Sequence, residues 1–534
     1  MLKDRLLKLG SLRSLMIVVF VVAALHRVLL HPSPLYENIV HPLPLVPTYG
    51  YFTGLGHVSG NYLGINWRDG TSIEEIKRNR DAIESYSSPT IATMWGYSAL
   101  GGIVFWFSGE ISEYNLMLVH ILLDSVAAVL VLLILFGITD DKWTSFIGGL
   151  LYAFWPMYAQ LCVKLEPNYI TPFFLLSTLY FAIRGIKSHM TRYFIISAII
   201  SGISLNFRMD NLFVIFSLGA FVMVISGNTK VPLFRYKVTM IMFVLPLMFL
   251  IPLIVRNYML YERFIIGPQN SGLVMHWQFE EFPYFYENAD FHVQDDGAGI
   301  ELAEKLGWEN KPDLGKHWVD GMNGIKFNTV MTQHFFSVIK DDPIKYIGHI
   351  ILRLPYIASY HDILSNRWLF KYPHDVREND NHPIALAIWH LPQWSAITAE
   401  AALMQAPWVE IKAIGDLANE KVKYRWPNSR RAPLISPRKL GSMLDHAIFI
   451  IFVLGVIAAF RYPYGMVPLA ILIGVVVSRA ITLIGDYQSI KYMYSIFVVY
   501  PIYIAIFVQT INLKKQILQK LLFYSKYMHI FRNI

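Results

Sequence analysis

Long apolar segments separated by short polar ones recur along most of the chain. Ten of them have about the length that an α-helix needs to cross a hydrocarbon core of roughly 30 Å. The ten segments are about 14–31, 114–136, 144–163, 168–183, 193–207, 211–226, 237–255, 444–460, 465–482 and 493–511. The sequence lacks the alternating apolar and polar residues of an outer-membrane barrel. The pattern therefore predicts an all-α polytopic membrane protein with about ten transmembrane helices.

The composition agrees with a protein that is largely surrounded by lipid. Of the 534 residues, 54% are hydrophobic and 16% are charged, whereas soluble proteins carry roughly 25% charged residues. The single cysteine, Cys162, excludes a disulfide within the chain and a cysteine-based metal cluster. The net charge of +8 does not predict nucleic-acid binding, because basic residues of membrane proteins concentrate in cytoplasmic loops.

The positions of Lys and Arg orient the predicted helices. If the basic N-terminus is inside, ten spans put further basic segments on the cytoplasmic side. These segments are the Arg184–Arg192 loop, the Lys230–Lys237 loop, Arg461 and the basic tail. Residues 90–109 are also apolar, but an eleventh span there would reverse every later loop. We therefore expect 90–109 to lie along the outer interface, or to re-enter from it.

This topology divides the chain into four parts. They are an N-terminal transmembrane module (1–256) with a first outer loop (32–113), an extracytoplasmic domain (257–443), the last transmembrane helices (444–511) and a basic cytoplasmic tail (512–534). The first apolar run ends at Leu25-His26-Arg27 without a cleavage site, which predicts an uncleaved anchor. In the outer domain, residues 327–360 have apolar positions at helical spacing, interrupted by Pro343 and Pro355, which predicts short helices.

Ionisable residues at the ends of the predicted spans are candidates for function, because charge at the membrane edge is costly. They are Glu166, Arg208, Asp210, Arg256, Asp486 and Lys491. Under the predicted topology, all of them lie at the outer end. A channel or a proton-coupled carrier would more typically place charges near the middle of the membrane or on both sides. The one-sided distribution favours an enzyme that works at the outer interface.

The cations of this group fit two interpretations. Arg256 follows a long apolar run and precedes Asn257-Tyr258, so it could be an interfacial anchor. It could also bind the phosphate of a lipid-linked donor at two points through its planar guanidinium. Lys491 is a second cation at the same predicted depth, and two cations on one phosphate would stabilise it as a leaving group. Arg208 fits either a phosphate contact or a simple ion pair with Asp210.

Carboxylates supply the complementary chemistry, since attack on a sugar carbon needs a base near the acceptor hydroxyl. Asp69 lies in the first outer loop, in the stretch NWRDGTS, where a solvated charge is the more ordinary role. Glu166 precedes Pro167 at a helix start, where the helix dipole alone would favour a carboxylate.

The order of these motifs resembles that of the GT-C glycosyltransferases, in particular the protein O-mannosyltransferase branch that includes the aminoarabinose transferase for lipid A. The stretch FVLPLMFLIPLIVRNYMLYERFIIGPQNSG (243–272) is similar to a family segment in which an apolar helix ends in Arg-Asn-Tyr. Weaker similarities occur in the same order at SSPTIATMWGYSALGG, KLEPNYITP, SGISLNFRMDN and GDYQSIKYMY. Residues 273–440 match no part of the family pattern.

The resemblance implies roles for individual residues. Arg256 would contact the donor phosphate, with Lys491 and Arg208 as supporting cations, and Glu166 would be a second essential carboxylate. The family's catalytic carboxylate in the first loop has a poor match in this sequence. In the family a Tyr follows that carboxylate closely, whereas GTSIEEI follows Asp69 here. Asp69 is therefore the first candidate for the base, and Glu37 and Asp81 are the alternatives.

The predicted function is transfer of a sugar from a polyprenyl-phosphate carrier to an acceptor hydroxyl on the extracytoplasmic side, with inversion at the sugar carbon. The acceptor could be a glycan, a lipid or a protein. A flippase for lipid-linked glycans and a catalytically inactive GT-C-like subunit remain alternatives. We expect an integral protein of a prokaryotic plasma (inner) membrane that contacts membrane lipids and no nucleic acid. No metal motif or cofactor is evident, since the His residues are scattered, and a divalent metal stays open.

Overall fold

The computed structural model of the chain describes a set of segments with gaps between them. They are residues 11–29, 94–110, 112–155, 157–158, 162, 167–225, 232–267, 272–273, 275–276, 296–314, 321–341, 343–344, 346–347, 437–482 and 494–512. The carboxylates Asp69, Glu37, Asp81 and Glu166 and the cation Lys491 lie outside these segments.

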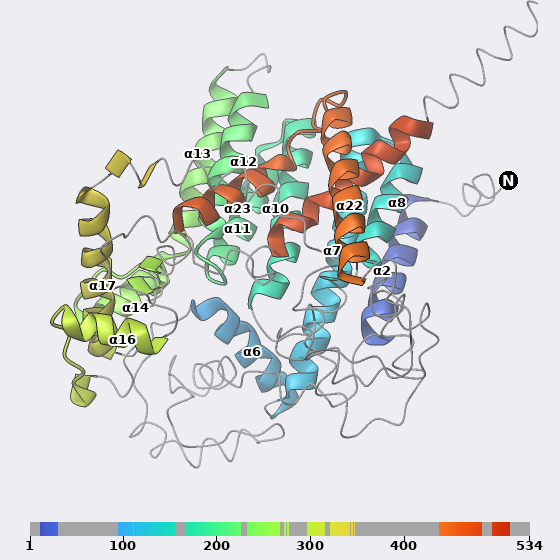
Figure 1. The fold of residues 1–534 in the computed structure, drawn as a ribbon. Coiled ribbons are helices and arrows are strands. Elements are labelled where there is room, and N and C mark those ends of the chain that lie inside the picture. The colour runs from blue at the N-terminus through green and yellow to red at the C-terminus, as the bar shows by residue number, and fades with distance from the viewer. Residues whose placement is uncertain are drawn as a thin grey trace, which may run out of the picture.

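Every regular element in this part of the chain is a helix (Figure 1). The helices of the N-terminal half are α2 (Leu12–Leu29), α6 (Trp95–Ser108), α7 (Glu113–Thr139), α8 (Lys142–Ala153), α10 (Pro167–Ser188), α11 (Thr191–Leu205), α12 (Asn211–Ile225), α13 (Pro232–Met248) and α14 (Ile251–Tyr261). They are followed by α16 (Asp296–Lys305), the short 3-10 helix η4 (Pro312–Leu314), α17 (Gly321–Asp341), α22 (Pro437–Ala459), α23 (Leu469–Thr482) and the 3-10 helix η6 (Tyr494–Val499).

Four helical segments, one of which includes the turn between α13 and α14, are long and apolar enough to cross a membrane. They are Tyr114–Thr139, Pro167–Ser188, Phe234–Tyr261 and Tyr494–Asn512, and four shorter apolar helices accompany them. The described part of the chain is thus an all-helical membrane protein. The number of ten spans, the sidedness and the four-part domain division stay predictions.

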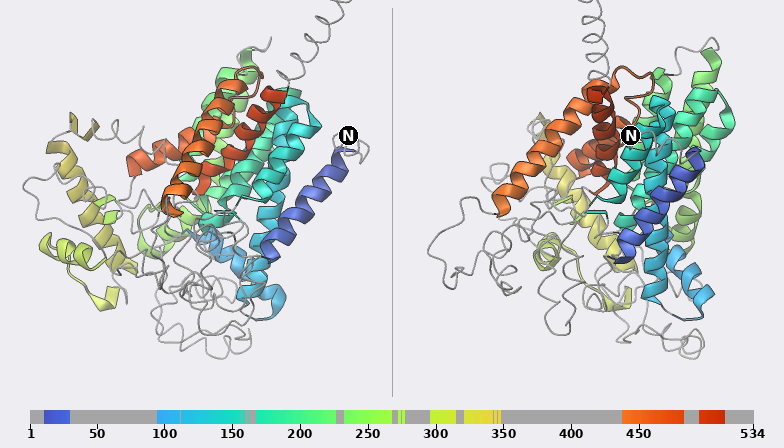
Figure 2. Two further views of the ribbon diagram at one scale, coloured as in Figure 1. Left: turned by 45° about the vertical axis from the view of Figure 1, so that its right-hand side comes forward. Right: turned by 90° about the vertical axis from the view of Figure 1, so that its right-hand side faces the viewer.

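Helices α2, α7, α8, α10, α11, α12, α13 and α23 form one bundle, and α16 and α17 lie beside it (Figures 1 and 2). α7 packs on α2, α8 and α10, α11 packs on α10 and α13, and α23 packs on α12. Backbones approach closely at Gly474, where an added Cβ would lie 2.4 Å from the Cα of Val214. Small residues are common at such contacts in membranes, because they let helices meet without an intervening side chain.

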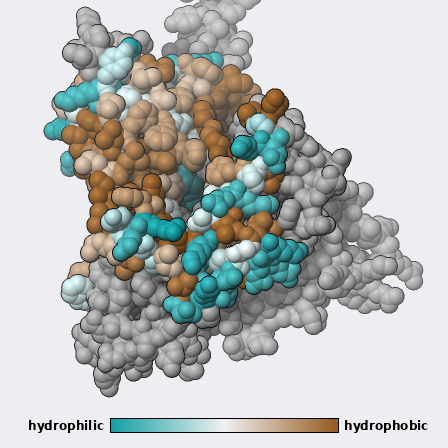
Figure 3. Space-filling model, turned by 90° about the vertical axis from the view of Figure 1, so that its left-hand side faces the viewer, coloured by the Kyte–Doolittle hydropathy of each residue, from teal (hydrophilic) through white to brown (hydrophobic). Residues whose placement is uncertain are grey.

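Apolar side chains are exposed on several helices of the bundle, as expected of surfaces in contact with lipid. On α2 they include Ile17, Val21 and Leu25. Figure 3 shows apolar residues gathered over one face of the bundle, with some hydrophilic residues at their upper edge and a larger hydrophilic group below them. At that end lie α6, α14, α16 and α17, away from the N-terminal end of α2 (Figures 1 and 2).

Two helices differ from the lengths that the sequence predicts. α8 ends at Ala153 rather than near residue 163, because Pro156 follows and disfavours helical backbone before it. The predicted span 237–255 is two helices, with a turn at Phe249–Leu250 before α14, which has Pro252 at its start. Arg256 therefore lies within α14, and the expectation that it directly follows the end of the apolar helix is wrong.

The helix α6 covers the segment that we expected to lie at the outer interface. Its 14 residues would extend only about 21 Å, less than the roughly 30 Å of a hydrocarbon core. Trp106 and Phe107 at its C-terminal end are 67% and 89% exposed. These properties favour an interfacial helix, and the prediction that 90–109 does not cross stays open to test.

Candidate functional site

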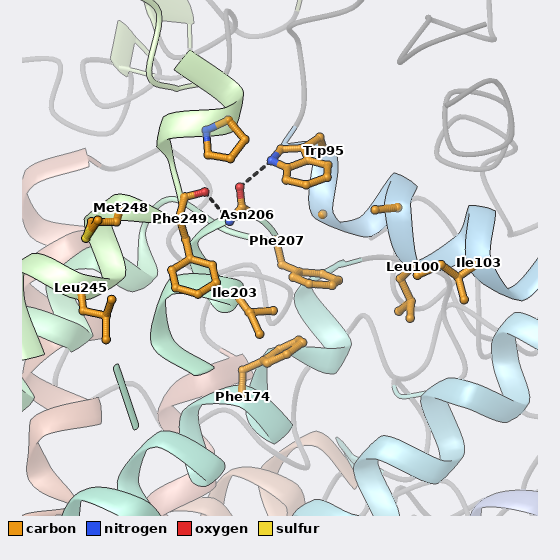
Figure 4. Close-up of a pocket in the computed structure, with 13 residues that line it drawn as sticks. Trp95, Leu100, Ile103, Phe174, Ile203, Asn206, Phe207, Leu245, Met248 and Phe249 are labelled. Atoms are coloured by element: carbon orange, nitrogen blue, oxygen red, sulfur yellow. Dashed lines mark hydrogen bonds between the residues drawn. The ribbon is translucent and has the colours of Figure 1, made fainter. Parts of the chain in front are cut away.

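An apolar cavity of about 720 Å³ lies between α6, α10, α11 and the α13–α14 turn. Its lining is almost entirely hydrocarbon (Figure 4). The lining includes Trp95, Ile103, Phe174, Ile203, Leu245 and Pro252. A cavity of this size and character suits an aliphatic chain better than a polar ligand.

Asn206, at the end of α11, holds α6 and the α13–α14 turn at the edge of this cavity. Its side-chain oxygen accepts a hydrogen bond from the indole N–H of Trp95, and its Nδ2 donates to the carbonyl of Phe249 at 3.2 Å (Figure 4). The backbone N–H of Gly96 donates to the carbonyl of Asn206 at 2.7 Å. A Cβ at residue 96 would lie 2.5 Å from that oxygen, so only glycine fits there. The hydrogen bonds of Asn206 thus set the separation of three elements that line the cavity.

The turn that follows Asn206 carries an ion-pair cluster. Arg208 donates to Asp210 through Nε at 2.8 Å and through Nη2 at 2.5 Å, and Arg479 on α23 donates to the same carboxylate. Burial alone would raise the pKa of Asp210, but the two guanidinium groups outweigh it and hold that pKa well below its ordinary value. The cluster carries two positive charges and one negative charge, beside Phe207 of the cavity wall.

Arg256 lies one helical turn beyond the cavity on α14. Pro252 lines the cavity, and residues four apart share one face of a helix, so Arg256 continues that face. The Arg256 side chain is half-buried, and its Nη1 donates to the Asn257 side chain at 2.9 Å. Asn257 is buried and donates to the carbonyl of Ile265 at 3.0 Å, which fixes the chain that leaves α14. The Arg-Asn-Tyr motif thus combines a cation near the cavity with a structural amide.

The structure brings two of the sequence-predicted site residues to the surroundings of one cavity. Arg208 follows the lining residue Phe207, and Arg256 lies a turn from the lining residue Pro252. Arg208 also forms the ion pair with Asp210 that the sequence left as an alternative. The positions of Asp69, Glu37, Asp81, Glu166 and Lys491 fall outside the described residues, so their roles stay predictions.

Several polar residues of the bundle were not among the sequence-based candidates. Arg479 and Asp124 lie inside predicted spans, where an ionisable residue is itself a signal of a special role. Arg27 was considered only as the end of the first apolar run. It is fully buried and donates to Asp124, which also accepts a hydrogen bond from Tyr152 at 2.7 Å.

A pair of histidines in the outer segment was also not among the sequence-based candidates. His276 and His334 are 58 positions apart in sequence, and their rings are hydrogen-bonded at 2.9 Å. Within the segments that the structure describes, no three His, Cys, Asp or Glu side chains cluster in a way that could hold a metal ion.

The central part of the bundle is similar to a known protein family. Residues 98–255 match the family described as dolichyl-phosphate-mannose-protein mannosyltransferase. That segment runs from α6 to α14 and contains most of the cavity wall. The match confirms the predicted resemblance to this family over these residues, which make up less than a third of the chain. Curated protein sequences give no match.

Solved structures with an overall likeness include three of an oligosaccharyltransferase of the archaeon Archaeoglobus fulgidus, which one of them names AglB. One is a complex with an inhibitory peptide and a dolichol-phosphate, one is the apo form, and one is tethered to an acceptor peptide. Each is 13% identical and covers 95% of this chain, with TM-scores of 0.46, 0.46 and 0.44. This chain spans about half the length of those proteins (51%, 51% and 50%). Likenesses at this level establish no activity.

Proposed function

We propose that the protein transfers a sugar from a polyprenyl-phosphate donor to an acceptor hydroxyl on the extracytoplasmic side of the membrane. The observation that carries the proposal is the apolar cavity with a cation one turn beyond it, at Arg256. A polyprenyl phosphate has the matching shape, because its apolar chain ends in a single anionic group. The chain would occupy the cavity, and the phosphate would lie at Arg256.

The reaction needs a base and a stabilised leaving group. A carboxylate of the first outer loop, for which Asp69 is the first candidate and Glu37 and Asp81 are the alternatives, accepts the proton of the acceptor hydroxyl. The hydroxyl oxygen then forms a bond to the anomeric carbon, while the bond from that carbon to the phosphate oxygen breaks with inversion. The electron pair stays on the lipid phosphate. Arg256, supported by Lys491 and Arg208, stabilises that charge.

The remaining assignments complete the proposal. Glu166 serves as the second essential carboxylate, and the outer domain holds a glycan, lipid or protein acceptor. The protein works in a prokaryotic plasma membrane, with its site facing outward. Its reaction requires no cofactor in this scheme, and addition of a chelator to the transfer assay tests whether a divalent metal takes part.

Reconstitution in liposomes with polyprenyl-phosphate mannose, the donor class named by the family match, tests the proposal. Membrane extract supplies the acceptor, and release of polyprenyl phosphate is measured. Asp69→Asn should keep donor affinity and lower turnover by about 10²–10⁴-fold. Arg256→Gln should weaken donor binding, whereas Arg263→Gln, an exposed arginine in the turn after α14, should not.

Two outcomes would contradict the proposal. Movement of the lipid-linked sugar between leaflets without release of polyprenyl phosphate would indicate a flippase. Donor binding without either process, in the presence of the acceptor extract, would indicate an inactive subunit. If release occurs but none of Asp69, Glu37 and Asp81 is needed, the assignment of the base to the first loop is wrong.

A further inference from the structure

Two arginines lie against one tyrosine ring where α10 ends and α11 begins. The Cζ atoms of Arg184 on α10 and Arg192 on α11 lie 5.6 Å and 5.0 Å from the centre of the Tyr193 ring. Nη2 of Arg192 also donates to the Tyr193 hydroxyl at 3.4 Å. Both arginines are exposed. Cation–π contacts thus hold two like charges at one ring, at the end of α11 away from the cavity residue Ile203.

The described residues supply no carboxylate that balances this arginine pair. None lies within ion-pair distance of Arg184 or Arg192. In the nearby turn between α7 and α8, Asp140 is already paired with Lys187 at 2.7 Å, and Asp141 accepts hydrogen bonds from the backbone at the start of α8. A guanidinium group has five N–H donors in a plane that fits phosphate oxygens. The pair is therefore suited to an anion with several oxygens.

An apolar stripe on α11 begins next to this pair. Ile195, Ile199 and Ile203 follow Arg192 at intervals of three or four residues, so all four share one face of the helix. The exposed fractions of the isoleucines are 39%, 36% and 37%. The rise from Arg192 to Ile203 is about 16 Å, close to half of the roughly 30 Å hydrocarbon core. The stripe therefore has the length of an acyl chain in one leaflet.

We propose that the arginine pair and the apolar stripe form a binding site for a phospholipid with an anionic headgroup. The headgroup phosphate lies between Arg184 and Arg192, and one acyl chain lies along the three isoleucines. A soluble anion matches the arginines but not the exposed isoleucines. A zwitterionic lipid matches the isoleucines but brings its own cation to the arginines. Charge and the adjoining lipid-facing surface thus select one occupant.

The site is independent of the proposed function, because its occupation requires no sugar transfer. Under the predicted topology, the bound headgroup belongs to the cytoplasmic leaflet, whereas the proposed donor phosphate lies at Arg256 on the other side. The phospholipid therefore acts as a structural ligand of the bundle.

Titration of the purified full-length protein with lipid, followed by native mass spectrometry, measures the preference. The probes are dioleoyl phosphatidylglycerol and dioleoyl phosphatidylcholine. We expect the wild type to prefer phosphatidylglycerol. The double variant Arg184→Gln/Arg192→Gln should bind it about 30-fold more weakly, because two cations are removed from an anionic contact, and should bind phosphatidylcholine as before. The control Arg461→Gln removes an exposed arginine on the same predicted side of the membrane and should match the wild type.

Crosslinking tests where the lipid binds. A photoreactive benzophenone side chain in place of Ile199 lies on the stripe, and one in place of Ile457 on α22, which is 57% exposed, samples the surrounding lipid. In nanodiscs with equal amounts of the two lipids, the label at residue 199 should react mainly with phosphatidylglycerol and lose this preference in the double variant. The label at residue 457 should show no preference in either protein.

Three results would overturn the inference. They are equal affinities of the wild type for the two lipids, an equal loss of affinity in Arg461→Gln, and displacement of phosphatidylglycerol by millimolar inorganic phosphate, which would indicate a soluble anion. Melting in detergent shows whether the double variant is folded. If it is not, the wild-type crosslinking at residues 199 and 457 decides, and equal lipid preferences at the two labels would refute the site. Neither experiment measures sugar transfer, so failure of the proposed function would leave these results intact.

Discussion

Arg479 donates a hydrogen bond to Asp210, a residue 269 positions earlier in the chain. The contact joins α23 to the turn between α11 and α12, whose other end borders the apolar cavity. Asp210 is already paired with Arg208, so one carboxylate holds two guanidinium groups. The C-terminal helices are thereby connected to the wall of the candidate donor site by a charge contact as well as by apolar packing.

Loss of Arg479 should destabilise the protein measurably. Its side chain is 3% exposed, and a hydrogen bond to a charged group contributes about 1.5–3 kcal/mol. We expect Arg479→Met to lower the melting temperature in detergent. The control Lys187→Met removes a pair with Asp140 in which the side chains are 39% and 71% exposed, and exposed pairs contribute about 0–1 kcal/mol. Equal effects of the two substitutions would show that the Arg479 contact contributes no more than a surface pair.

The charge of Asp210 leads to a prediction about pH. Its pKa is held below the ordinary value, so the carboxylate binds protons less readily in the folded state than in the unfolded state. Its contribution to stability is therefore fully present above the unfolded pKa and is lost only as the pH falls through the lower folded pKa. The difference in melting temperature between wild type and Asp210→Asn should stay constant between about pH 7 and pH 5. A difference that shrinks in this range would contradict the ion-pair geometry.

The histidine pair in the outer segment predicts a loss of stability at a higher pH than the loss predicted for Asp210. Burial, together with repulsion by the neighbouring His334, lowers the pKa of His276 to about 4. Nδ1 of His276 donates to the carbonyl of Gly272 at 2.8 Å, so Nε2 accepts from His334. Protonation of His276 would turn Nε2 into a donor, so the hydrogen bond that His334 on α17 donates to it would be lost. Because the unfolded state takes up the proton first, stability contributed here is present above about pH 6.5 and is lost progressively toward pH 4.

Hydrogen exchange of α17, corrected for the intrinsic effect of pH, measures this loss. We expect protection of Gly321–Asp341 to fall between pH 7 and pH 4.5, while α11 keeps its protection. His276→Gln keeps a donor and an acceptor without titrating, so it should abolish the dependence. A pH effect that persists in His276→Gln would assign the titration to another group.

The helices could be predicted where the residues that determine them lie within the same short stretch of sequence. Apolar runs located the long helices of the bundle, but in the outer segment the prediction of short helices from residue 327 was wrong, because α17 is a single helix of 21 residues that begins at Gly321. Proline removes a backbone donor and restricts the preceding residue, so its effect needs no tertiary information. The turn at Phe249–Leu250 was missed because the apolar run continues through it.

The site was predictable only in part, for a physical reason. Arg256 was identified because a cation beside an apolar helix is unusual in sequence. The pairing of Asp210 with Arg479, and of Arg27 with Asp124, depends on contacts between residues far apart in the chain, which no local pattern specifies. An ionisable residue inside an apolar run was the available signal for Asp124 and Arg479.

The cavity predicts a specific dependence on the lipid of the donor. Ile203 lines it and is 37% exposed, whereas Ile195 on the same helix is 39% exposed and does not line it. Ile203→Trp would fill space that an isoprenoid chain would occupy, and Ile195→Trp is the matched control. Exclusion of about 100 Å² of apolar contact would cost about 2.5 kcal/mol, which is close to a 10²-fold loss of affinity.

Donors of different chain length separate this effect from general damage to the fold. A tryptophan in the cavity should weaken the binding of a long polyprenyl-phosphate mannose by about 10²-fold, and the binding of an analogue with a single isoprene unit much less. Both donors would make the same phosphate contact at Arg256, so a change in that contact would not alter the ratio of the two affinities. Ile195→Trp should leave the ratio of the two affinities unchanged. Equal weakening of both donors by Ile203→Trp would show that the substitution disturbs the phosphate end, and an unchanged affinity for the long donor would mean that its chain binds elsewhere in the protein.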